Sequence, residues 1–442
     1  MRKLSIILFI IGIGFVSTWG VLNFWPSDSA KQALKQNKGK SILDFNVEAK
    51  ENQPVKTFNV TAKQTEWKIN NQTSTNAWTY NGTVPGKEIR VQEGDFVKIH
   101  LKNKLDVPVT IHWHGVILPN KMDGVPDVTQ EAVQPGESFT YEFSADDAGT
   151  YWYHSHQHSS KQVDKGLYGA FIVESKEKTY TKDHTLILDE WAVNQEKQSF
   201  SNMRSMMMGG MSGNGEADTE AMYDTFTING KNGDSIQPIQ LKKGEKARLR
   251  FVNAGYQVHT IRFPKESMKV LAVDGESVQT QTNQSSNLLE IAPGERIDVE
   301  YVQTNQTTSL IRDMTSDESE QSISIPFQTG QSNSKNQNSH ETQASSNTVN
   351  GTTFSSENLI FNQTPKNVDV SYEMKLDMGM NMGEGMVFQI NNDTFPDTNP
   401  IDVAKGDLVK VRLTNQGMLN HPMHLHGHRF QVVKKMGIKQ LL

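Results

Sequence analysis

Histidines spaced two residues apart are the residues of this sequence best suited to chemistry. They form three pairs, which are His112 and His114, His154 and His156, and His424 and His426. In an extended segment the side chains of residues i and i+2 project from one face, so each pair offers two imidazoles together. Neutral imidazole is the commonest metal ligand in proteins and suits copper, zinc, iron and nickel. Three such pairs among only 13 histidines predict a metal centre rather than unrelated surface or core histidines.

The elements that must position these pairs are expected to be strands. From about residue 52 the sequence breaks into short segments in which apolar and polar residues alternate, separated by Gly, Asn and Pro. Examples are Val97–Leu101, Phe139–Phe143 and Ala247–Phe251. No long amphipathic helix stands out, so the body of the chain is predicted to be all-β.

An internal repeat predicts three similar domains. A glycine precedes an asparagine by nine residues in each copy, at Gly94 and Asn103, Gly244 and Asn253, and Gly406 and Asn415. The residues between them alternate as in a strand, and a histidine follows each copy, at His112, His259 and His421. We expect domains at 52–175, 176–330 and 351–442, joined by a disordered linker at 331–350 that is rich in Gln, Asn and Ser.

Composition excludes some classes of function. The 442 residues carry a formal net charge of -6, so nothing indicates a nucleic-acid partner. The sequence contains no cysteine, which excludes disulfides, thiolate metal sites and a cysteine nucleophile.

The N-terminus indicates a location. Arg2 and Lys3 precede Leu4–Trp25, an uncharged run long enough to cross a bilayer as a helix. We expect residues 1–25 to be a single-pass membrane anchor, with a polar tether at 26–51 and the body outside the cytoplasm. Cleavage of the run as a signal sequence, with secretion of the rest, is the alternative.

Long motifs around the histidines carry a resemblance to a known family. They are Ile111–Gly115, Gly149–His156, Gly166–Ala170 and His421–His428. With the repeat, they make the chain similar to the three-domain multicopper oxidases, which include laccases and the metallo-oxidases of bacterial copper resistance. The resemblance implies cupredoxin-like Greek-key β-sandwich domains, with a trinuclear copper cluster between the first and the last.

The resemblance also implies the role of each histidine. His112 and His424 would bind the type 2 copper, and His421 would bind the type 1 copper. The type 3 pair would be bound by His114, His154, His156 and His426. The second domain matches the repeat at His259 but offers no partner imidazole, so we interpret it as a spacer.

Asp123, in the segment Met122–Pro126, matches the family's acidic residue near the cluster. As a catalytic group, a carboxylate there could pass protons to oxygen as it is reduced. The alternative is a turn aspartate, because Asp before Gly is a common turn pair.

One departure from the family pattern matters more than any match. The family closes its third domain with a His-Cys-His segment, whereas this sequence has no cysteine. The type 1 site then keeps His421 alone, and the trinuclear site is partial, with four of the six type 3 imidazoles. We therefore expect an incomplete third domain and a C-terminally truncated chain that is inactive or a fragment.

Methionines offer a second kind of copper ligand, because thioethers are soft and select Cu(I). One group is Met203, Met206, Met207, Met208 and Met211. A second group lies within Met374–Met386. Methionine is otherwise a flexible core filler, so a cuprous site competes with a packing role.

Two functions remain open at this point. The first is an oxidase of copper tolerance that couples one-electron oxidation of Cu(I) or of a phenol to the reduction of O2 to water. The second is an extracytoplasmic protein that binds or sequesters copper without turnover.

Overall fold

The computed structural model describes most of the chain between residues 47 and 434. The described residues are 6–8, 11–13, 47–177, 180–193, 223–264, 268–279, 287–303, 309–315, 324–328, 348–350, 365, 367–381, 385–395, 397–417 and 421–434. Strands dominate, and the α-helix of the described part is the short α2, Ser159–Asp164. The predicted all-β class is therefore confirmed, whereas the domain boundaries stay predictions.

The first domain consists of two four-stranded sheets. One sheet has the order β4-β3-β6-β8, with bounds Ser74–Tyr80, Val55–Lys68, Phe96–Asn103 and Ser138–Ser144. The other has the order β5-β10-β9-β7, with bounds Gly86–Gln92, Tyr168–Glu174, Gly149–His154 and His112–His114. Alternate residues of β6 are buried, which is the periodicity read from the sequence. Between the sheets, the buried aromatic core includes Trp113, Tyr141, Phe143 and Phe171.

The second domain consists of two six-stranded sheets. One has the order β12-β11-β14-β19-β16-β17, with bounds Thr225–Ile228, Lys182–Trp191, Lys246–Asn253, Arg296–Val302, Met268–Val273 and Glu276–Ser277. The other has the order β13-β21-β20-β15-β18-β22, with bounds Ile239–Gln240, Ser324–Gln328, Ser309–Asp313, His259–Arg262, Leu288–Ile291 and Thr348–Asn350.

A shared apolar cluster joins these two domains. Trp152 and Tyr168 from the first pack with Ile187, Trp191 and Val252 from the second. A buried polar contact reinforces the junction, because the Thr150 hydroxyl donates to Asp298 Oδ1 at 2.7 Å. Strand β9, which ends at the predicted ligand His154, is therefore held by contacts with the second domain as well as by its own sheet.

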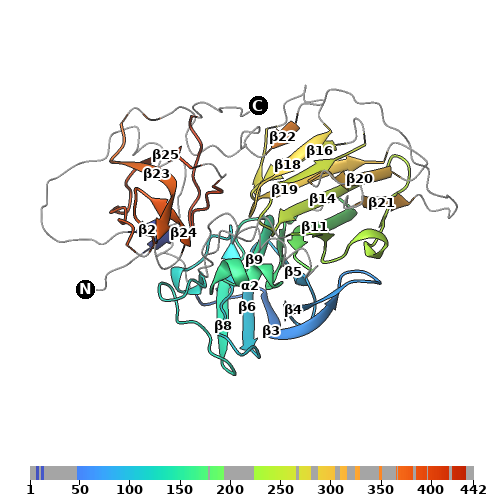
Figure 1. Ribbon diagram of the computed structural model, residues 1–442, viewed down its shortest axis with the longest axis horizontal. Coiled ribbons are helices and arrows are strands. Elements are labelled where there is room, and N and C mark those ends of the chain that lie inside the picture. The colour runs from blue at the N-terminus through green and yellow to red at the C-terminus, as the bar shows by residue number, and fades with distance from the viewer. Residues whose placement is uncertain are drawn as a thin grey trace, which may run out of the picture.

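The third domain is a smaller three-stranded sheet of order β24-β23-β25, with bounds Gly385–Ile390, Val370–Asn381 and Val409–Asn415. In Figure 1 this orange-red sheet stands apart from the second domain, and the first domain lies below both. Its buried core is small, comprising Met374, Leu376 and Ile401.

Two expectations differ from the structure. Within the apolar run Leu4–Trp25, the described residues Ile6–Leu8 and Ile11–Ile13 form paired antiparallel strands, β1 and β2, because short β-branched runs suit strand as well as helix. No helix of the described residues is long and apolar enough to cross a membrane. The linker expected at 331–350 ends in β22, where Val349 is buried against the second domain. The rest of that linker lies outside the described residues.

Candidate metal centre

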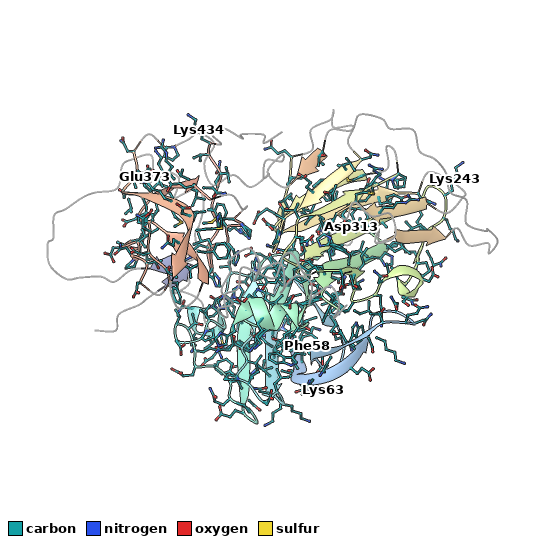
Figure 2. All side chains as sticks on the ribbon, viewed as in Figure 1. Phe58, Lys63, Lys243, Asp313, Glu373 and Lys434 are labelled. Atoms are coloured by element: carbon teal, nitrogen blue, oxygen red, sulfur yellow. The ribbon has the colours of Figure 1, made fainter. Side chains whose placement is uncertain are left out.

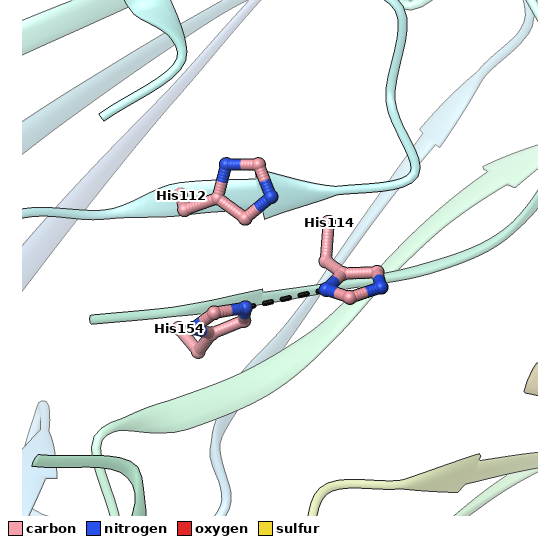
Figure 3. Close-up of side chains that lie close together, drawn as sticks. All are labelled: His112, His114 and His154. Atoms are coloured by element: carbon pink, nitrogen blue, oxygen red, sulfur yellow. Dashed lines mark hydrogen bonds between the residues drawn. The ribbon is translucent and has the colours of Figure 1, made fainter. Parts of the chain in front are cut away.

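Strands β7 and β9 place the first histidines on one face of a sheet. They pair antiparallel with His112 opposite His154 and Trp113 opposite Tyr153. Neighbouring residues of a strand point to opposite faces of the sheet. Trp113 and Tyr153 therefore point into the aromatic core, and the histidines point away from it. Figure 3 shows the resulting group, in which His114 Nδ1 lies 3.4 Å from His154 Nε2.

The Asp123 loop packs directly against β7. Gly124 has φ +76°, and a Cβ there would lie 1.9 Å from the Ile111 carbonyl oxygen, so a side chain would prevent this approach. The approach lets His112 Nδ1 donate to the Asp123 carbonyl at 2.8 Å. That bond fixes the ring and leaves Nε2 as the ligand atom.

The histidine-rich segment near residue 424 reaches the same place from the third domain. Residues 421–434 form no strand, and a turn occurs at His426 and Gly427, yet both His424 and His426 reach the same site. His426 Nδ1 donates to Asp123 Oδ2 at 2.8 Å. Asp123 also ends the 3-10 turn Asn120–Met122 (η1) and is buried, so it lies both at a turn and beside the histidines, and its catalytic role stays a prediction.

Six of the seven predicted histidine ligands form one cage. The His114 and His424 rings stack with centroids 3.7 Å apart, and the His112 and His426 centroids are 4.2 Å apart. His156 completes the cage, with its centroid 5.3 Å from that of His426. Two ligand triplets have their nitrogens within 4.8 Å, namely His112 with His114 and His154, and His112 with His424 and His426.

Electrostatics favour the neutral form of several cage histidines. Burial, followed by neighbouring imidazoles, holds the pKa of His114, His156 and His424 well below the ordinary value. The same causes lower the pKa of His154 to about 3. A neutral ring keeps the lone pair that a metal needs, whereas a protonated ring does not.

The cage fits copper. Nε2 of His112 and Nε2 of His424 are buried and have no hydrogen-bond partner among the described residues. Buried polar atoms are almost always satisfied, so such orphaned nitrogens require a further partner. An all-imidazole donor set suits copper, and the hydrogen bonds to Asp123 orient the rings from outside. The assignment of individual histidines to the type 2 copper or to the type 3 pair stays a prediction.

His421, the seventh predicted ligand, does not join the cage. Its ring stands edge-on to Phe388 with centroids 5.7 Å apart, and its Nε2 lies 3.5 Å from a Cβ built at Gly417. Met378 Cγ lies 3.7 Å from that same position. His428 donates to the His426 carbonyl at 3.2 Å and serves as a support. The methionines Met203–Met211 lie outside the described residues.

The second domain also borders the cage, which no pattern in the sequence indicates. Buried Arg296 donates to the carbonyls of Thr150 at 3.3 Å and Asp274 at 3.0 Å, which ties β19 to β9. Its charge contributes to lowering the pKa of His114. A Cβ built at Gly294 would lie 3.4 Å from the His114 ring. A lone arginine at the start of an ordinary strand offers no pattern from which this placement could be read.

Arg429 links all three domains. It belongs to the segment of the third domain that carries His426, and its Nε lies 2.7 Å from Glu276 of the second domain. Its guanidinium also lies 3.3 Å from Asp147 of the first domain. These two ion pairs of Arg429 fix the irregular segment at a point three residues beyond His426, its last cage ligand.

The second domain replaces a metal position with an ion cluster. His259 is fully buried; its Nδ1 contacts Asp313 Oδ2, and its Nε2 contacts Glu190 Oε2 at 3.2 Å. Burial alone would lower the pKa of His259, but the two carboxylates raise it to about 10. A ring that donates from both nitrogens has no lone pair for copper.

Comparison with known proteins supports the same reading. Three family models, each described as multicopper oxidase, match residues 61–178, 182–322 and 362–440. Copper resistance protein A of Pseudomonas syringae pv. tomato is 33% identical over 239 residues, covering 46% of this chain and 39% of that protein. Multicopper oxidase mco of Staphylococcus haemolyticus is 26% identical, covering 96% of this chain and 86% of that protein. The chain spans only about two fifths of the length of the copper resistance proteins it matches.

Solved structures show the same architecture. The blue copper oxidase of Nitrosomonas europaea has a TM-score of 0.54 and 32% identity, covering 62% of this chain and 86% of that one. Fet3p, a multicopper oxidase that functions in iron import, has a TM-score of 0.72 and 22% identity, covering 87% of this chain and 77% of that one. Because the three family models together match most of its residues, the chain belongs to the multicopper oxidase family.

Proposed function

We propose that the chain serves copper-dependent oxidation in copper tolerance, in which one-electron oxidation of Cu(I) or of a phenol is coupled to the reduction of O2 to water. The observation that supports it most is the cage of six imidazoles between the first and third domains. Relatives named copper resistance protein A and laccase support the substrate classes. Copper bound in the cage would supply the one-electron redox chemistry.

The chain's own contribution to such a reaction is to hold ligands and carry protons. Arg296 and Arg429 tie the other two domains to the elements that bear the ligands. Asp123 accepts from His426 through Oδ2, whereas Oδ1 accepts no hydrogen bond among the described residues. Although burial opposes it, the adjacent His426 and His112 side chains hold the pKa of Asp123 well below its usual range. An ionised oxygen at the cage can take up a proton and hand it to oxygen being reduced.

Copper binding without turnover is the second candidate, and the composition favours it for this chain in isolation. A blue type 1 centre needs a thiolate with two histidines, and the sequence has no cysteine. His421 is the predicted type 1 ligand, and it lies against Phe388, apart from the cage. Without that centre, an outside electron donor lacks the usual entry to the cage copper.

The two candidates are separated by loading the purified chain with copper. We expect copper to be retained after gel filtration, with neither a blue thiolate-copper absorption band nor oxygen uptake on Cu(I) or phenol. The variant His424→Ala/His426→Ala should lose the retained metal, whereas His158→Ala, which removes an exposed imidazole beyond β9, should keep it. A blue band or steady oxygen uptake would favour the oxidase for this chain alone, and equal retention by both variants would remove the cage from the proposal.

We also propose that the body of the chain works outside the cytoplasm, either anchored by or cleaved after the apolar run Leu4–Trp25. The proposal is supported by Arg2 and Lys3 ahead of that run. If the run anchors the chain, protease added to intact cells should digest the body of the protein. If the run is cleaved, the body of the protein should be found in the culture medium. Full protection inside intact cells would contradict both forms.

A further inference from the structure

The turn between the cage ligands His154 and His156 is centred on Ser155, which is fully buried. The carbonyl of Ser155 accepts a hydrogen bond from His154 Nδ1 at 2.9 Å. That bond orients the ring and leaves Nε2 as its ligand atom, as the bond from His112 to the Asp123 carbonyl does on β7. The position of the Ser155 backbone therefore determines where His154 presents its lone pair.

A buried glutamine of helix α2 holds this serine in place. The Ser155 hydroxyl donates to Gln162 Oε1 at 2.6 Å, and Gln162 is only 2% exposed. The main chain adds two bonds through Leu167, whose N–H donates to the Gln162 carbonyl at 3.1 Å and whose carbonyl accepts from the Ser155 N–H at 3.0 Å. Ser155 is thus fixed to the α2 segment through both its side chain and its backbone.

The same glutamine also reaches the segment that carries the other ligand pair of the first domain. Its Nε2 donates to the carbonyl of Pro108 at 2.9 Å, and Pro108 lies four residues before His112. The two ligand segments meet once more where the His156 N–H donates to the Thr110 hydroxyl at 3.3 Å. Gln162 therefore spans the gap between the two segments, with its acceptor on one and its donor on the other.

The chemistry of these two contacts requires an amide. A primary amide offers an acceptor and a donor at one end of the side chain, whereas a carboxylate has no N–H for the Pro108 carbonyl and a thioether has neither group. Burying a polar side chain costs free energy unless its hydrogen bonds are replaced. Packing alone would therefore favour an apolar residue at position 162, and the two bonds are what a glutamine adds.

We propose that Gln162 is a positioning residue of the copper cage, which sets the separation of its two first-domain histidine pairs by joining Pro108 to Ser155. It acts through Ser155 and does not touch the metal. The inference rests on the proposed function, because the separation of the ligands matters to copper only if the cage binds it.

Replacement of the amide by a thioether of similar length tests the proposal. Gln162→Met should weaken copper binding by about 10-fold in competition with a chelator, as changes to groups that orient metal-bound histidines do. The electron paramagnetic resonance spectrum of the Cu(II)-loaded chain should also change its parallel hyperfine splitting, because the histidine nitrogens have moved. A glutamine that only stabilised the fold would lower the unfolding midpoint and leave the affinity and the spectrum of the folded chain unchanged.

The same substitution at the surface provides the control. Gln64 is exposed on β3, and Figure 2 shows its neighbour Lys63 at the outside of the first domain. Gln64→Met should keep the wild-type copper affinity, spectrum and unfolding midpoint.

A double-mutant cycle tests whether Gln162 acts through Ser155. Ser155→Ala removes the hydroxyl without adding bulk and should weaken copper binding about as much as Gln162→Met. The double variant should lose about 10-fold rather than the product of about 100-fold, because both changes break the same connection. Should Gln162→Met fail to fold, the affinity and spectrum of Ser155→Ala decide the question.

The possible failures are distinguishable. The positioning role is overturned if the wild-type chain and the single variants bind copper equally with one spectrum, or if the two losses multiply in the double variant. If the wild-type chain itself retains no copper, the proposed copper site is overturned, and this inference falls with it.

Discussion

Replacement of His259 by leucine is expected to lower the free energy of unfolding of the second domain by about 3–5 kcal/mol at neutral pH. The imidazolium lies fully buried between Asp313 and Glu190, so its removal leaves two carboxylates in the interior without a counter-charge. Losing one partner of a buried ion cluster costs about that much. Denaturant unfolding followed by circular dichroism measures the change.

The same cluster predicts a pH dependence with a definite sign. The folded pKa of His259, about 10, lies above its ordinary value of 6.5. Its contribution to stability is therefore complete below pH 6.5 and is lost as pH rises through 10. The wild-type protein should lose stability between pH 7 and pH 10 relative to His259→Leu, and the two should converge at the upper end.

A surface histidine provides the control for this experiment. His100 is exposed, and its ring contacts only the Thr140 hydroxyl among the interactions of the described residues, at 2.9 Å. His100→Leu should change the stability by less than about 0.5 kcal/mol. Equal losses at His100 and His259, or a loss at His259 that does not vary with pH, would refute the ion-cluster account.

The second large effect is expected at Asp123. Asp123→Asn should weaken copper binding by about 10- to 100-fold, which is the usual loss when a group that orients metal-bound histidines is altered. The carboxylate accepts from His426 at 2.8 Å, and its other oxygen lies 3.2 Å from His112 Nδ1, so its charge lies between rings contributed by two domains. Competition with a copper chelator of known affinity measures the change.

The control for Asp123 lies in the same loop. Asp127 is exposed and has φ +62°, a conformation that asparagine tolerates well, so Asp127→Asn should leave both folding and copper affinity unchanged. Circular dichroism should show the same strand signal in both variants. If Asp123→Asn binds copper as tightly as the wild-type chain, the carboxylate does not orient the cage.

Local patterns in the sequence predicted the first half of the cage well. The alternation around Trp113 places His112 and His114 on one face of a real strand, and the same rule holds where His154 pairs with His112. His424 and His426 also project together, although they meet the others from a segment that forms no strand. These histidines could be identified as ligands from their close spacing in the sequence, because imidazole remains a metal ligand whatever the conformation of the backbone that carries it.

Contacts between domains could not be predicted, because they have no local signal. No pattern around Arg296 or Arg429 indicates a partner in another domain. The fold brings Thr150 next to Arg296 and Glu276 next to Arg429. His259 looked like a spacer histidine, and the carboxylates that hold it, Glu190 and Asp313, lie 69 and 54 residues away. The choice between helix and strand near the N-terminus depended on a short isoleucine-rich run, in which periodicity is a weak guide.

The bond between Asp123 and His426 spans 303 residues of chain. Closing so long a loop carries an entropic cost that only contacts made after closure can offset. During synthesis the cage therefore cannot assemble until the ribosome has produced nearly the whole polypeptide described in this structure, when the first two domains can already be folded. Copper could therefore find its full set of ligands only after the segment around His426 has been made, and a bound ion would then hold residues of the first and third domains together.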